Sequence, residues 1–376
     1  MARRSEDLDL MTASPGTSRR LAVHRYGDAG ARPKAYLQAS LHADELPGGL
    51  VLHHLMARLD DADVAGEIVI VPAANPIGFG QQILGEHVGR YEATTGVNFN
   101  RSYPDLGTHV LERLAGRLGP DAATNVALIR AAMVEVLDDL TPTREIDQLK
   151  LALVRLAIDA DIVLDLHCDL EAELHLFLSP ELWPAGRDLA AELGAVATLL
   201  ALDSGGGSFD EVFSLPWHKV RARFGGADVP VPPACLSGTV ELRGQADIDD
   251  RTATADAAAL FRFLQRRGLI AGDAGPEPAL AHDATPLTAC DVIRSPAAGI
   301  LVFKQTLGAE VVAGDLVAEV LDPMAPPGTP RTEIRTQTTG RLFSRARTRL
   351  ARPGGSVAKV RGTEPLPDRT GYLLED

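Results

Sequence analysis

The 376-residue sequence predicts an α/β protein, with a mostly parallel mixed sheet covered by helices on both faces and a small C-terminal all-β module. Apolar strand-like runs alternate with helix-like runs over residues 34–267, a pattern typical of such a sheet. A Gly/Pro/Ala-rich stretch at 271–286 then reads as a linker, and only short β-like runs follow it. We therefore predict two domains, at residues 1–272 and 284–376.

The larger domain contains short apolar runs that we interpret as strands. They lie at residues 35–40, 67–72, 161–166, 174–178 and 239–242. Between them, apolar residues recur at three- and four-residue intervals, which is typical of helices. This spacing predicts a helix that begins at Leu50, mostly helical structure over 109–160, and further helices at 187–200 and 253–267.

The C-terminal module contains an internal repeat. Residues 293–320 resemble residues 334–360, and Gly299 aligns with Gly340 at the same offset. Two similar all-β halves predict a small pseudo-symmetric barrel-sandwich. A lipoyl or biotinyl carrier of this shape needs a lysine on the hairpin between its halves. Residues 322–330 contain no lysine, so we expect a structural module instead.

Charge and composition exclude several classes of partner. The formal net charge of −14 leaves no basic excess to neutralise phosphates, so we expect no nucleic acid partner. No apolar run is long enough to span a bilayer, so we expect no membrane association. The three cysteines form no CxxC pair and no secretory signal is recognisable, which together predict a cytoplasmic protein.

The polar residues His42 and Glu45 follow the first of these strands, in a strand-to-helix loop. Open α/β sheets place their ligand sites at the carboxyl ends of strands. A histidine and a carboxylate three residues apart can converge on one cation, and a mixed nitrogen and oxygen set suits Zn²⁺. A polar loop without metal is the alternative interpretation of this pair.

His167 follows the apolar run at 161–166 and is the candidate third ligand. A catalytic zinc keeps three protein ligands and one water, so this set would be complete. Asp165 points to the same side of the strand and either orients a ligand or is a buried structural carboxylate. A hydrogen-bonded loop histidine is the alternative for His167.

Glu241 lies near the end of the last predicted strand of the larger domain. A hydrolytic zinc site needs a base that takes a proton from water and returns it to the leaving group. Arg90 and Arg101 offer planar cations for an oxyanion or a substrate carboxylate, with Asn100 beside them. The alternatives are a surface glutamate and ordinary solvated arginines.

Four segments of the sequence resemble, in the same order, the succinylglutamate desuccinylase/aspartoacylase family. They are HADE, NFNR, DLHCD and TVELRG, which begin at residues 42, 98, 165 and 239. The family belongs to the zinc carboxypeptidase-like superfamily, so the resemblance implies that fold. It also implies zinc ligands at His42, Glu45 and His167, a catalytic Glu241, an Asn100–Arg101 pair and an arginine at Arg90.

The resemblance implies a zinc-dependent hydrolase, with one Zn²⁺ per chain, that cleaves the amide bond of an N-acyl amino acid or a related small N-acyl amine. The motifs name neither the acyl group nor the amine. Two alternatives stay open: a zinc carboxypeptidase that acts on short peptides, and a metal-binding protein without catalysis. Whether the chain forms a homo-oligomer also stays open.

Overall fold

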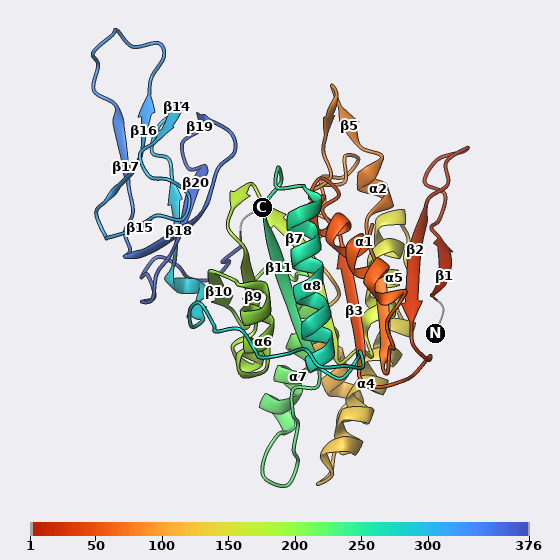
Figure 1. Ribbon diagram of the computed structural model, residues 1–376. Coiled ribbons are helices and arrows are strands. Elements are labelled where there is room, and N and C mark those ends of the chain that lie inside the picture. The colour runs from red at the N-terminus through yellow and green to blue at the C-terminus, as the bar shows by residue number, and fades with distance from the viewer. Residues whose placement is uncertain (1–2, 375–376) are drawn as a thin grey trace.

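The computed structural model describes residues 3–374 and contains a nine-stranded sheet (Figure 1). In their order across the sheet, its strands are β1 (Arg4–Asp9), β2 (Arg20–Tyr26), β4 (Glu67–Val71), β3 (Lys34–Ala39), β7 (Ile162–Asp169), β11 (Leu236–Gly244), β9 (His175–Leu178), β10 (Ala197–Leu200) and β12 (Thr285–Pro286). The pairings β4–β3, β3–β7, β7–β11, β9–β10 and β10–β12 are parallel. The others, β1–β2, β2–β4 and β9–β11, are antiparallel, so the predicted mostly parallel mixed sheet is confirmed.

Helices cover both faces of this sheet, as predicted. One layer comprises α1 (Pro47–Leu59), α6 (Trp183–Leu193) and α8 (Asp250–Arg266). The other comprises α3 (Leu106–Leu114), α4 (Ala122–Asp138), α5 (Glu145–Ala157) and α7 (Glu211–Phe224). Neighbouring residues of β3 separate the two cores, since Ala35 and Leu37 pack against the first layer and Tyr36 against the second. No helix within residues 3–374 is long and apolar enough to cross a membrane.

The predicted helix at 187–200 is wrong in its second half. Helix α6 ends at Leu193, and Gly194 follows in the left-handed conformation with φ of 66°. Glycine adopts this conformation without a steric penalty and commonly terminates helices. The remaining residues form β10, whose parallel pairing with β9 and β12 outweighs the helix propensity of the Ala/Leu pattern.

Shorter elements connect the main ones. They are α2 (Pro76–Phe79), the hairpin of β5 (Gln82–Ile83) and β6 (Glu86–His87), β8 (Glu171–Ala172), and the 3-10 turns η1 (Pro180–Leu182) and η2 (Leu287–Ala289). The hairpin projects from the same edge of the sheet as the carboxyl ends of β3 and β7 (Figure 1).

The C-terminal module consists of two facing sheets with one apolar core between them. Its strands are β13 (Cys290–Arg294), β14 (Gly299–Phe303), β15 (Glu310–Val311), β16 (Leu316–Leu321), β17 (Thr332–Arg335), β18 (Gly340–Arg345), β19 (Leu350–Ala351) and β20 (Ser356–Arg361). The repeat predicted from the sequence is visible as β13–β16 followed by β17–β20. Gly299 and Gly340 both have positive φ, and a Cβ atom on either would collide with the carbonyl oxygen of Leu321 or Arg361, respectively.

Ion pairs connect this module to the end of β7 and the segment that follows it. Segment 169–173 carries an acidic residue at every second position, and strand β8 within it pairs antiparallel with β18. The contacts are Asp169 with Lys359 (2.8 Å), Glu171 with Arg345 (2.6 Å) and Arg349 (2.7 Å), and Glu173 with Arg341 (2.7 Å). The module is therefore held beside the carboxyl ends of the central strands.

Candidate metal centre and active site

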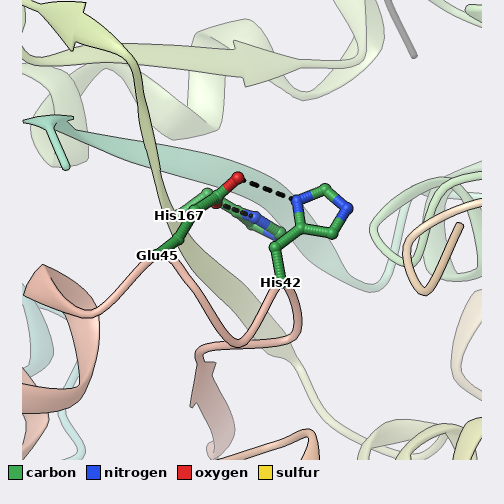
Figure 2. Close-up of side chains that lie close together, drawn as sticks. All are labelled: His42, Glu45 and His167. Atoms are coloured by element: carbon green, nitrogen blue, oxygen red, sulfur yellow. Dashed lines mark hydrogen bonds and ion pairs between the residues drawn. The ribbon is translucent and has the colours of Figure 1, made fainter. Parts of the chain in front are cut away.

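The three predicted ligands meet at one point, with ligand atoms within 4.8 Å of one another, and all three are buried (Figure 2). The carboxylate of Glu45 lies between the two rings. Its Oε1 is 2.9 Å from Nδ1 of His42, and its Oε2 is 2.7 Å from Nδ1 of His167. The backbone N–H of Cys168 also donates to Oε2, at 3.2 Å.

A tight turn presents His42 and Glu45 together. The backbone N–H of Glu45 donates to the carbonyl of His42 at 3.0 Å, and the Ser40 hydroxyl donates to the carbonyl of Glu45 at 3.2 Å. Ser40 itself has a positive φ of 58°, which turns the chain sharply at the end of β3. Gly89 packs so closely that a Cβ there would collide with the backbone of Ala43 and Asp44. The turn is thus fixed from both sides.

Hydrogen bonds on the outer side of each ring assign the tautomers. Asn98 Oδ1 accepts the backbone N–H of Asn100 at 2.8 Å, so it is an acceptor, and Nε2 of His42 at 2.9 Å must donate to it. Nε2 of His167 lies 2.9 Å from a carboxylate oxygen of Asp165 and must likewise donate. When both rings are neutral, as metal ligation requires, Nδ1 of each therefore carries a lone pair that faces Glu45.

This donor set fits a divalent cation. Two lone pairs and one carboxylate face each other at hydrogen-bond distance, and positive charge is needed between them. Burial alone would lower the pKa of His167, but the negative charges of Asp165 and Glu45 raise it well above its usual value. Burial likewise opposes ionisation of Glu45, yet the two histidines hold its pKa well below the usual range. Two imidazoles and one carboxylate are a ligand set that zinc uses in hydrolases.

A buried chain of side chains supports His167. Asp165 is fully buried, and its second oxygen accepts from the Gln38 amide at 2.9 Å. The Gln38 oxygen in turn accepts from the Tyr36 hydroxyl at 2.8 Å. Such contacts fix ring orientation and tautomer at metal sites. Of the two interpretations of Asp165, the structure favours the one in which it orients a ligand.

Glu241 lies beside His167, because the two residues are register partners in the parallel pair β7–β11. Both residues lie inside their strands, which run two or three positions further than the sequence predicts. Oε2 of Glu241 is buried and has no hydrogen-bond partner within the described residues. Burial, together with the nearby charge of Glu45, raises the pKa of Glu241 to about 8. A carboxyl group with these properties is suited to proton transfer.

Arg90 reaches the ligands themselves, since its Nη1 lies 3.2 Å from Oε1 of Glu45 and 3.2 Å from Nδ1 of His42. Asn100 is also close, with Nδ2 at 3.3 Å from Nε2 of His167 and Oδ1 accepting the backbone N–H of Phe209 at 2.8 Å. The structure therefore places Arg90 and Asn100 at the site, and the oxygen of the Asn100 amide is already engaged by the backbone of Phe209.

Arg101 lines a cavity that His42 and Glu45 also line, and it donates from Nε to the Tyr372 hydroxyl at 3.1 Å. Two residues that the sequence analysis does not single out support this segment. Asn98 fixes the His42 ring, and buried Lys150 donates to the carbonyl oxygens of Asn98 (3.3 Å) and Arg101 (2.6 Å). Asn98 belongs to the NFNR segment, whereas no local pattern distinguishes Lys150.

Two cavities meet at Glu45 and Arg90, which line both of them. A cleft of about 680 Å³ opens between the sheet and the C-terminal module, with polar lining residues such as Gln245, Arg294 and Arg345. An inner chamber of about 130 Å³ extends over the sheet past Glu241 and Thr239. Hereafter these are called the cleft and the inner chamber.

The fold and the site together define a class of protein, a mixed α/β protein with a buried His/Glu/His group that could hold a metal ion. A family model that describes the succinylglutamate desuccinylase/aspartoacylase catalytic domain matches residues 31–129 of this chain. A structure from Shewanella amazonensis SB2B that bears this family's name is 27% identical, with a TM-score of 0.82 over 95% of this chain and 98% of its own. These matches confirm the resemblance to the family that the motifs predict.

Further solved structures agree. A structure from Shewanella frigidimarina NCIMB 400 with the same family name is 25% identical, with a TM-score of 0.84 over 96% of this chain and 97% of its own. The ectoine utilization protein EutE (DoeB) from Ruegeria pomeroyi shares the fold at 21% identity and a TM-score of 0.67, over 96% of this chain and 95% of its own. No curated protein matches the chain.

Proposed function

We propose that this protein is a zinc-dependent hydrolase that cleaves the amide bond of an N-acyl amino acid or a related small N-acyl amine. The observation that carries the proposal is the group of two histidines and one carboxylate beside a buried oxygen of Glu241 that has no hydrogen-bond partner within the described residues. The family resemblance supports the same class of reaction, since its name describes a desuccinylase and an acylase.

A zinc ion held by His42, Glu45 and His167 would lower the pKa of a bound water toward about 7 and polarise the substrate carbonyl. Glu241 would accept the proton of the attacking water and return it to the leaving nitrogen, using the oxygen that has no other partner. Arg90 would place a guanidinium beside the negative charge that develops on the carbonyl oxygen.

We assign different roles to Asn100 and Arg101, which the sequence predicts to contact the substrate. Because its amide oxygen accepts the backbone N–H of Phe209 and its amide nitrogen lies beside the His167 ring, Asn100 would position its neighbours rather than hold a substrate carboxylate. Arg101 lines the inner chamber and would contact the substrate there.

The open cleft also favours a second candidate, a carboxypeptidase acting on short peptides, because it is large enough for a residue beyond the scissile bond. A panel of N-acyl amino acids and short peptides, assayed with and without a chelator, separates the two. Preferential hydrolysis of the N-acyl amino acids, lost with zinc and restored by it, is expected. Faster hydrolysis of peptides would favour the second candidate.

The variant Glu241→Gln tests the assigned base and also the non-catalytic alternative. We expect it to keep its zinc and to lose at least roughly hundredfold in turnover, since acid–base catalysis contributes 10²–10⁴. The matched control is Glu112→Gln, at an exposed position on α3. Near-normal turnover by zinc-loaded Glu241→Gln would show that the base is wrongly assigned.

A further inference from the structure

The inner chamber runs down one face of the sheet along β11. Thr239 and Glu241 are two residues apart, so their side chains point to the same face. Phe177 of β9 is in register with Thr239, and Leu199 of β10 is in register with Phe177. All four residues line the chamber, and its walls are therefore partly apolar. An aliphatic chain would pack against Phe177 and Leu199.

Asp210 lines the inner chamber and lies against β11. Its carbonyl oxygen accepts from the hydroxyl of Ser237 at 3.0 Å, four residues below Glu241 on the same strand. A strand rises about 3.3 Å per residue, so the backbones of Ser237 and Glu241 lie roughly 13 Å apart along the strand.

Several groups near Asp210 are polar and point to a ligand. The Asp210 carboxylate accepts one hydrogen bond from the hydroxyl of Ser208, at 2.6 Å. Next to it, Glu211 accepts the backbone N–H of Ser204 at 2.7 Å. Ser204 also lines the chamber, is 3% exposed, and its hydroxyl has no hydrogen-bond partner within the described residues. This hydroxyl and the second oxygen of Asp210 are available to a bound molecule.

No cation is paired with Asp210 within residues 3–374. The cationic side chains that line the chamber contact other groups: Arg90 binds Glu45, Arg101 binds the Tyr372 hydroxyl, Lys359 binds Asp169, and Arg369 binds the carbonyl of Leu373. Burial and the adjacent charge of Glu211 raise the pKa of Asp210 to about 7. A carboxylate in this setting gains from a cation that enters with the substrate.

Glu241 indicates which part of the substrate enters the chamber. Glu45 and Arg90 line both cavities, whereas Glu241 lines the chamber and not the cleft. The leaving nitrogen has to lie next to the group that protonates it. The amine product would therefore lie in the inner chamber, and the acyl group would extend into the cleft.

We propose that Asp210, with Ser204 and Ser208, forms a subsite for a second amino group on the leaving amine. The substrates are then compounds acylated on one nitrogen that carry an ammonium group at the end of a short aliphatic chain. This inference rests on the proposed function, because Glu241 as proton donor sets the orientation. An N-acyl diamino acid and an N-acyl diamine share the chemistry that the subsite recognises.

The test compares zinc-loaded enzyme on Nα-acetyl-lysine and Nα-acetyl-ornithine with Nα-acetyl-norleucine, which has a similar stem and no ammonium. A charged hydrogen bond contributes enough to favour the ammonium substrates by roughly 10- to 100-fold in kcat/KM. Succinylated versions of the same amines cover the unknown acyl group, and N-acetyl-1,4-diaminobutane separates diamines from diamino acids. A wild-type ratio near one would overturn the proposal.

The variant Asp210→Asn should bring the ratio of ammonium to neutral substrate close to one. Its matched control is Asp203→Asn, an exposed carboxylate of the same loop that lies outside the chamber. The control should keep the wild-type ratio. An unchanged ratio in Asp210→Asn would overturn the proposal.

A binding measurement separates this proposal from the proposed function. Free lysine should raise the Tm of the zinc-loaded protein more than norleucine does, and Asp210→Asn should abolish the difference. If no acylated compound is hydrolysed, the proposed function fails, while this Tm difference still supports the cation subsite. Equal Tm shifts with lysine and norleucine in the wild type would overturn it.

Discussion

The candidate metal centre and the contact with the C-terminal module differ in how they are stabilised. Around the metal centre, side chains are buried and each hydrogen bond fixes the next, from Tyr36 through Gln38 and Asp165 to His167. The contact with the module contains half-exposed ion pairs, such as that between Glu171 and Arg345, beside a small apolar cluster in which Phe343 packs against Leu199. Buried polar groups are costly to leave unpaired, whereas exposed ion pairs contribute little each. Substitutions should therefore have large effects at the first region and graded effects at the second.

Removing a ligand should have the largest effect. His167→Ala eliminates one of the three groups that face the cation position, so we expect loss of bound zinc and of detectable hydrolysis. Metal analysis of the purified protein measures the bound zinc, and the substrate panel measures the hydrolysis. His53→Ala, at an exposed position on α1, is the control. Retention of a full equivalent of zinc in His167→Ala would contradict the ligand assignment.

Removing the negative charge of Asp165, which orients His167, should have a smaller effect. Asp165→Asn leaves the volume unchanged but weakens the orientation of His167, and loss of such contacts typically costs 10- to 100-fold in metal affinity. Competition with a zinc chelator measures this affinity. The control, Asp291→Asn, changes a buried carboxylate of the module that accepts from Thr336. Equal zinc affinities of the two variants would contradict the comparison.

At the module contact, Glu171→Gln should leave zinc content unchanged and raise KM by a few-fold. Glu171 pairs with Arg345 and Arg349, and half-exposed pairs of this kind contribute up to about 1 kcal/mol each. Added salt should weaken the same contact in the wild type, because it screens exposed charges. Steady-state kinetics at low and high salt measure both effects. A loss of zinc in this variant would mean that the two regions are coupled.

The smallest expected effect is a pH dependence of the module contact. Burial opposes ionisation of Glu171, but hydrogen bonds from Arg349 and Arg345 outweigh it and lower its pKa. A carboxyl group with a lowered pKa stabilises the folded state above its unfolded pKa, about 4.3, and this stabilisation is lost as the pH falls through the folded value. The Tm difference between wild type and Glu171→Gln should therefore shrink below about pH 4. A constant difference would contradict this.

The sequence predicts the sheet, its two helical layers and the three candidate ligands because each of them corresponds to a pattern of residues that are close together in the sequence. His42 and Glu45 lie in one turn, and an apolar run precedes His167. The strand β10 was missed, because Ala and Leu favour a helix until pairing with the neighbouring strands is known. The extension of β7 and β11 past the predicted ends also depends on that pairing.

Other parts of the site depend on contacts between distant segments. Lys150 lies in an ordinary amphipathic helix, and only the fold places its ammonium beneath the carbonyl groups of Asn98 and Arg101. Asp210 follows a Gly/Ser-rich loop that suggests flexibility and gives no sign of a chamber below. The alternating acids at 169–173 resemble a solvated face until the arginines of the module, more than 160 residues away, are placed against them.

The register pairing of His167 with Glu241 would couple backbone geometry directly to the proposed catalysis. Backbone hydrogen bonds between β7 and β11, rather than side-chain contacts, set the separation between the candidate metal ligand and the proposed proton carrier. Side chains alternate between the faces of a strand, so a shift of β11 by one residue would turn Glu241 toward the helices on the opposite face. Inserting or deleting one residue in β11 ahead of Glu241 should thus remove the base from the site while leaving all three ligands in place.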